Sequence, residues 1–153
     1  MHIALIEPEI PQNTGNISRT CVMTGSTLHL VGKLGFSIEN RYLRRAGLDY
    51  WPYLTFYRYP DFHSLFEKYR EHRFYFFTTK AEKTYAEILY TNDDFLVFGK
   101  ETTGLPPEIL QCWQGSCLRI PMIDNIPRSL NLSNAVAIVL YEALRQRGFP
   151  NMK

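Results

Sequence analysis

The sequence predicts a single α/β domain, residues 1–153, built on an open parallel sheet with helices on both faces. Short apolar, β-prone segments alternate with segments of helical periodicity, the order expected for a sheet with crossover helices. Several apolar segments are nearly continuous rather than alternating, which is typical of strands covered on both faces. With 153 residues, 45% of them hydrophobic, the chain has the size and composition of one globular domain.

Six short apolar segments are expected to form the strands of this sheet. They are residues 2–6, 28–31, 55–57, 74–77, 95–98 and 117–120. Three helices are expected between and after them. The first covers residues 14–24 and ends near Gly25, and the second follows Asp61, a residue type that caps helices. The third runs from Leu132 towards Gly148, because apolar residues repeat at helical spacing before that glycine.

Composition excludes several classes of protein. The formal net charge of +2 neither requires nor excludes a nucleic-acid partner. The first residues lack the pattern of a secretory signal, and no apolar run approaches the roughly 20 residues that span a bilayer, so we expect a cytoplasmic protein. The three cysteines and four histidines match no zinc spacing, and we expect no metal.

An unusual polar segment follows the first expected strand. It contains Asn13 and Asn16, with Arg19 shortly after them. Ligands of open α/β sheets bind at the carboxyl ends of the strands, so these residues are candidates for a site. In the alternative interpretation, Asn13 only caps the next helix and Arg19 lies on its solvated face.

The second unusual segment, residues 98–107, follows the fifth expected strand. Gly99 and Gly104 allow close approach of a ligand to the backbone, and Glu101 lies between them. The segment lacks the spacing of a P-loop, and the chain contains no Gly-x-Gly-x-x-Gly fingerprint. The alternative interpretation is a tight turn from a strand into a helix.

The third segment, residues 120–134, leads into the last helix. Ser129, Asn131, Ser133 and Asn134 lie within six positions, directly after a loop that contains prolines. Each one alone is an ordinary helix cap, but caps do not explain their number.

In this order and at these separations, the three segments resemble the trefoil-knotted methyltransferases of the SPOUT superfamily, along essentially the whole chain. Asn13 and Arg19 look like that family's first motif, Gly99 to Leu105 like its Gly-x-Glu-x-x-Gly-Leu motif, and residues 129–134 like its Ser-x-Asn-x-Ser-Asn run. The stretches IEPEIPQNTGNISR and LRRAGLDY look like the small single-domain subgroup. Members of that subgroup methylate the ribose 2′-OH of wobble nucleotide 34 in leucine tRNAs.

The resemblance implies a deep C-terminal trefoil knot in the parallel six-stranded sheet, an obligate homodimer, and S-adenosylmethionine as cofactor. The residues expected to contact this cofactor are Phe77, Thr78, Gly99, Glu101, Gly104, Ile120, Met122, Ser129, Leu130 and Ser133.

The resemblance also implies a catalytic set. The family's motif arginine corresponds to Arg19, which we expect to bind phosphate or to stabilise developing negative charge on oxygen, because a guanidinium stays protonated. Asn13, Glu101, Ser129 and Asn131 would orient it, the ribose and the cofactor. Among them, Glu101 is the residue best suited to orient a partner, because a carboxylate close to an arginine can form a bidentate pair.

RNA binding is expected from phosphate contacts, and the charge is segregated along the chain. Residues 19–58 hold six basic residues against two acidic ones, whereas residues 84–118 hold one basic against five acidic. The expected RNA contacts are Arg19, Arg41, Arg44, Arg45 and Tyr141. In the alternative interpretation these basic residues lie on a solvated helix face, and Tyr141 is a half-buried interface residue.

Two other functions remain open from the sequence. One is a non-catalytic RNA-binding dimer of the same fold, which would bind RNA without methyl transfer. The other is a flavodoxin-like or other mononucleotide-binding domain, which would not respond to S-adenosylmethionine.

Overall fold

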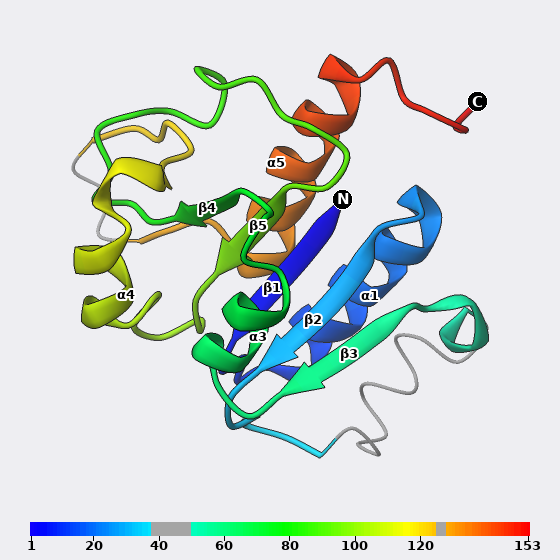
Figure 1. Cartoon of the computed structure of the whole chain (residues 1–153), viewed down its shortest axis with the longest axis horizontal. Coiled ribbons are helices and arrows are strands. Elements are labelled where there is room, and N and C mark those ends of the chain that lie inside the picture. The colour runs from blue at the N-terminus through cyan, green and yellow to red at the C-terminus, as the bar shows by residue number, and fades with distance from the viewer. Residues whose placement is uncertain (38–49, 125–127) are drawn as a thin grey trace.

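The computed structural model describes residues 1–37, 50–124 and 128–153, and in them six strands form one parallel sheet (Figure 1). The order across the sheet is β3-β2-β1-β5-β4-β6, and every pair of neighbours runs parallel. The strands are β1 (His2–Ile6), β2 (Thr27–Val31), β3 (Phe56–Tyr59), β4 (Phe74–Phe77), β5 (Phe95–Phe98) and β6 (Cys117–Leu118). The predicted parallel sheet is confirmed.

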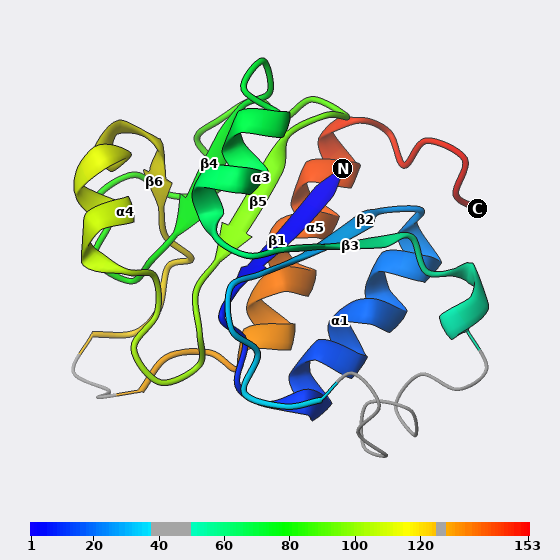
Figure 2. The ribbon, with the colours of Figure 1, turned by 60° about the horizontal axis from the view of Figure 1, so that its bottom comes forward.

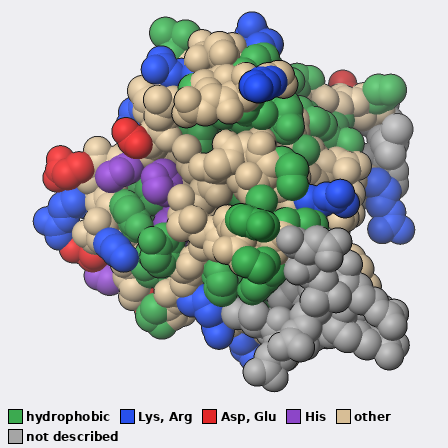
Figure 3. All heavy atoms as spheres, turned by 90° about the vertical axis from the view of Figure 1, so that its right-hand side faces the viewer, with side chains coloured by type: hydrophobic (Ala, Val, Ile, Leu, Met, Phe, Trp, Pro, Cys, Tyr) green, Lys and Arg blue, Asp and Glu red, His purple; other side chains and the backbone are tan. Residues whose placement is uncertain are grey.

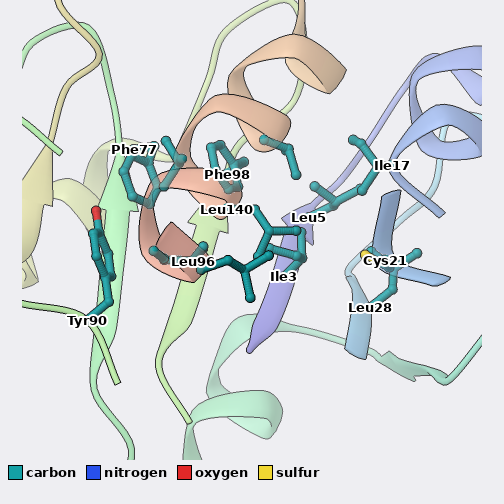
Figure 4. Packing of buried hydrophobic residues seen from close by; sticks show 14 of the residues in the cluster. Ile3, Leu5, Ile17, Cys21, Leu28, Phe77, Tyr90, Leu96, Phe98 and Leu140 are labelled. Atoms are coloured by element: carbon teal, nitrogen blue, oxygen red, sulfur yellow. The ribbon is translucent and has the colours of Figure 1, made fainter. Parts of the chain in front are cut away.

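Helices cover both faces of the sheet, as expected (Figure 2). One face carries α1 (Pro11–Thr24) and α5 (Leu132–Gln146), and the other carries α3 (Phe62–Lys68) and α4 (Pro107–Cys112). The alternation of side chains along each strand divides the core in two. Figure 4 shows the layer under α1 and α5, where Ile3 and Leu5 of β1 lie near Ile17 and Leu140. Ala4 and Ile6 of the same strand face the other layer.

Most element boundaries agree with the sequence, and the differences have local causes. The strand expected at 55–57 lies at Phe56–Tyr59, and the one expected at 117–120 ends at Leu118. The helix expected to begin at residue 14 begins at Pro11, because proline fits the first helical position, where no N–H is needed. It ends as expected at Gly25, whose φ of 63° lies in the left-handed region. The short helix α4, which also begins with a proline, was not among the three expected helices; it follows the turn of residues 98–107, where only the alternative interpretation placed a helix.

The chain returns from β6 to α5 through residues 119–131. Residues 125–127 of this connection lie outside the described residues, so the knot stays a prediction. Among the helices of the described chain, none combines the length and the apolar character needed to cross a bilayer.

Candidate active site

A pocket of about 860 Å³ lies at the carboxyl ends of β1, β4, β5 and β6. The chain leaves β1 towards β2 on one side, while β5 pairs with β1 on the other, so the strand order reverses between these two strands. In open α/β sheets this reversal opens a crevice where ligands bind. The volume lies within the range of about 300–1,000 Å³ typical of small-molecule sites.

The loop after β5 closes tightly on itself. A Cβ added to Gly99 would lie 2.0 Å from the carbonyl carbon of Gly104 and 2.2 Å from the nitrogen of Leu105. The N–H of Gly104 donates to the carbonyl of Lys100 at 2.9 Å, and Gly104 itself has a φ of 73°. The tight turn of the alternative interpretation is therefore real, but its residues also line the pocket.

The carboxylate of Glu101 binds the start of α1. It accepts hydrogen bonds from the backbone N–H of Glu9 at 2.8 Å and of Ile10 at 3.2 Å, and from Nδ2 of Asn13 at 3.0 Å. A negative charge is favourable at this end of a helix. Among the described residues, backbone and amide donors bind the oxygens of Glu101, and Arg19 does not.

Asn13 joins all three polar segments. Its side chain is 5% exposed; Nδ2 donates to Glu101, and Oδ1 accepts from Nδ2 of Asn131 at 2.9 Å. The capping alternative is wrong for Asn13, which lies inside α1. It is right for Asn131, whose Oδ1 caps α5 by accepting from the N–H of Ser133 at 2.9 Å. Residues separated by 88 and 118 positions thus meet at one amide.

A second set of contacts ties the loop after β1 to the loop after β5. Glu9 accepts from Oγ1 and from the N–H of Thr102, and Glu7 pairs with Lys100 at 2.7 Å. The hydrogen bond to Glu7 raises the pKa of Lys100. Glu7 has a φ of 49°, a conformation that residues other than glycine rarely adopt. No role was predicted from the sequence for Glu7, Glu9, Lys100 or Thr102. The feature that could have indicated one is the pair of acids at positions 7 and 9 together with the polar residues on both sides of Glu101.

The predicted cofactor residues gather at the pocket with one exception. Phe77, Thr78, Gly99, Glu101, Gly104, Ile120, Met122, Ser129 and Leu130 all line it. Ser133 does not, and both its N–H and its Oγ donate to Asn131.

Of the five predicted catalytic residues, four line the pocket. They are Asn13, Glu101, Ser129 and Asn131. Arg19 is not among the lining residues; its side chain is exposed, and its guanidinium carbon lies 5.5 Å from the centroid of the Tyr50 ring.

Of the five predicted RNA contacts, the structure describes Arg19 and Tyr141. Arg41, Arg44 and Arg45 lie outside the described residues. Tyr141 is 44% exposed on α5, where its ring centroid lies 6.5 Å from that of Phe149, and it does not line the pocket. No group of three His, Cys, Asp or Glu side chains in the described part of the chain is placed to hold a metal ion.

The parallel sheet and the glycine-walled pocket at its switch point define an α/β enzyme that binds a small molecule across the strand ends. Residues 1–141 match the SpoU rRNA Methylase family, and the chain belongs to this family. It is a methyltransferase, and the resemblance that the three motifs indicated is confirmed. This decides against the non-catalytic RNA-binding dimer and the mononucleotide-binding domain.

Individual relatives match along nearly the whole chain. A protein of Escherichia coli (strain K12), named tRNA (cytidine(34)-2′-O)-methyltransferase, is 44% identical over 151 residues, covering 98% of this chain and 96% of that protein. A solved structure described as "Structural insights into the 2-OH methylation of C/U34 on tRNA" is 41% identical, with a TM-score of 0.90 over 96% of this chain and 95% of that one. An AdoMet-bound rRNA methyltransferase from Sinorhizobium meliloti is 26% identical, with a TM-score of 0.81 over 94% of this chain and 55% of that one.

Proposed function

We propose that the protein methylates the ribose 2′-OH of nucleotide 34 in leucine tRNAs, with S-adenosylmethionine as methyl donor, and that it acts as a homodimer in the cytoplasm. The observation that carries the proposal is the meeting of three distant polar segments at Asn13, on the wall of the strand-end pocket. Nucleotide 34 is supported by the name of the Escherichia coli relative and by the description of the 41% identical structure. The leucine isoacceptors are proposed from the resemblance to the small single-domain subgroup, which the LRRAGLDY segment carries in part.

The residues of the pocket fit S-adenosylmethionine. Gly99, where any side chain would strike backbone, leaves the floor of the pocket open to main-chain contacts. Phe77, Ile120 and Leu130 supply apolar surface for an adenine ring, and Thr78 and Ser129 supply polar groups. The Sinorhizobium meliloti relative is described as AdoMet-bound, which supports the same ligand here. When bound, S-adenosylmethionine would supply an electrophilic methyl carbon.

The chain must orient the ribose hydroxyl and stabilise the charge that develops on its oxygen. Holding the reacting atoms in line can lower the barrier by several kcal/mol. Arg19 is suited to the charge, since its guanidinium offers several donors and stays protonated. Helix geometry places Arg19 about 9 Å along α1 from Asn13, which lines the pocket. We therefore assign Arg19 to the pocket of a second copy of the chain.

The surface of α1 and α5 supports the homodimer. Met23 on α1 is 57% exposed, and Ile138 and Tyr141 on α5 are 37% and 44% exposed. The two helices pack side by side on one face of the sheet, so these apolar side chains belong to one surface. Figure 3 shows exposed hydrophobic side chains lying between Lys and Arg side chains on one side of the molecule. A surface of this character suits a partner chain together with RNA.

Methyl transfer tests the substrate and the position. The protein is incubated with bulk tRNA and S-adenosylmethionine labelled in its methyl group, and the labelled nucleotides are mapped. We expect a single 2′-O-methyl group at nucleotide 34 of leucine tRNAs. Label at another nucleotide would overturn the specificity, and no transfer to any tRNA would overturn the function.

Subunit mixing tests the assignment of Arg19. Arg19→Ala and Gly99→Ala are each expected to be inactive, the first without its cation and the second without its pocket. If Arg19 acts in the partner's pocket, a mixed dimer has one complete site, and mixing the two variants restores activity. An unchanged background after subunit exchange would show that Arg19 serves its own chain. Arg70→Ala, which removes an exposed arginine paired with Glu67, is the matched control and should keep full activity.

A further inference from the structure

Arg19 belongs to an exposed stripe along α1. Gln12, Asn16, Arg19 and Met23 are the exposed residues of this stripe, spaced by three or four positions. Within the described residues, no hydrogen bond or ion pair holds Arg19. Its contact is the face of the Tyr50 ring, 5.5 Å from the guanidinium carbon to the ring centroid, within the range of an attractive cation–π contact.

The backbone of Tyr50 is held in place by contacts that do not involve Arg19. It directly precedes the 3-10 helix η1 (Trp51–Tyr53), and its carbonyl accepts the N–H of Tyr53 at 2.9 Å. The Trp51 ring lies 5.3 Å from the ring of Phe56 on β3, and Phe56 packs against the core layer under α1. Figure 2 shows this teal turn of helix beside α1, in agreement with the contacts between the two elements. The backbone at Tyr50 is thus held by η1, which is anchored on β3 through Trp51 and Phe56.

We propose that Tyr50 is a positioning residue for Arg19, and this rests on the proposed function. A carboxylate partner would also hold a guanidinium, but it would occupy two donors and neutralise the charge. An aromatic face holds the guanidinium by its π surface and leaves the in-plane N–H donors free for a phosphate or a ribose oxygen. In the structure the face of the Tyr50 ring lies against Arg19.

A series of rings at position 50 tests the contact. Tyr50→Phe is the reference, and phenylalanines carrying one, two and three fluorine atoms weaken the negative face of the ring with little change in its size. We expect kcat for tRNA methylation to fall stepwise along the series, and Tyr50→Leu to lose about tenfold. The KM for S-adenosylmethionine should stay constant. Tyr53→Leu, in the same 3-10 helix and 76% exposed, is the matched control and should keep wild-type kcat.

Three outcomes separate the possibilities. A flat fluorine series, or a Tyr50→Leu variant with wild-type kcat, overturns the role of Tyr50 while the proposed function stands. A wild-type protein that methylates no tRNA overturns the function, and the role falls with it. Because Arg19→Ala is expected to be inactive, tRNA affinity is the readout in that background. Changing Tyr50 to Leu there should not weaken tRNA binding further; an additional tenfold loss of affinity would show that the ring acts on something other than Arg19.

Discussion

Replacing Glu101 by Gln tests whether this carboxylate positions the site or takes part in the chemistry. The carboxylate accepts three hydrogen bonds, from the N–H groups of Glu9 and Ile10 and from the Asn13 amide. Gln keeps one acceptor oxygen, and its NH2 group must then face a backbone N–H at the 2.8 Å or the 3.2 Å contact. Losing one hydrogen bond to a charged group costs about 1.5–3 kcal/mol. Losing the charge at the helix start adds about 0.3–1 kcal/mol.

We therefore expect Glu101→Gln to lower the free energy of unfolding by about 2–4 kcal/mol, and Tm by roughly 4–16 °C for a domain of this size. Urea unfolding and differential scanning calorimetry, at one fixed protein concentration, measure the two quantities. The matched control is Glu71→Gln, an exposed carboxylate, which should change stability by less than about 0.5 kcal/mol. If Glu101→Gln is as stable as this control but transfers no methyl group, the carboxylate acts on the substrate, and the positioning argument is refuted.

Three other substitutions follow from the geometry. Gly99→Ala places a Cβ 2.0 Å from a backbone atom and should lower the free energy of unfolding by more than about 3 kcal/mol. It should also abolish binding of S-adenosylmethionine, measured by calorimetry. Gly115→Ala, with open space around it, is the control and should do neither. Burial lowers the pKa of His29 to about 3. As pH falls below about 6.5, this histidine is therefore protonated in the unfolded chain but not in the folded one, which favours unfolding. Between pH 7 and 4.5 the wild type should lose about 2–3 kcal/mol of stability that His29→Phe does not lose. Met23→Glu should give monomers in analytical ultracentrifugation and end methyl transfer, and Leu89→Glu, at an 82% exposed site, should leave the dimer intact.

The sheet and its helices were predictable because the information is local. Strands such as β1, β4 and β5 are continuous apolar segments, and their boundaries agree residue for residue. The edges of the sheet were less predictable. β6 keeps only Cys117 and Leu118 as a strand, because Arg119 pairs with Lys83 and Thr84 of a loop instead of continuing along β4. Nothing near Arg119 in the sequence indicates that partner.

The position of the site was predictable from the sequence, but the hydrogen bonds within it were not. Polar segments that follow strands of a parallel sheet must gather at one edge, which is why Asn13, Glu101 and Asn131 were singled out together. Which of them bond depends on how the loops close. Gly99 turns the loop after β5 so sharply that Glu101 meets the start of α1, and only the folded chain brings these groups within 3.0 Å.

The hydrogen bonds among the site side chains limit which groups can stabilise the negative charge that develops in the proposed reaction. Both oxygens of Glu101 and both polar groups of the Asn13 amide are already engaged, and so is the side-chain oxygen of Asn131. These side chains hold one another, so what they leave for a ligand is largely backbone. A developing negative charge needs a cation nearby, and of the basic residues that line the pocket, Lys80, Lys100 and Arg128, Lys100 is paired with Glu7. Under the proposed function, Arg19 adds a cation to this pocket from a second chain: its guanidinium lies on the face of Tyr50, and in the described residues its side-chain N–H groups form no hydrogen bond.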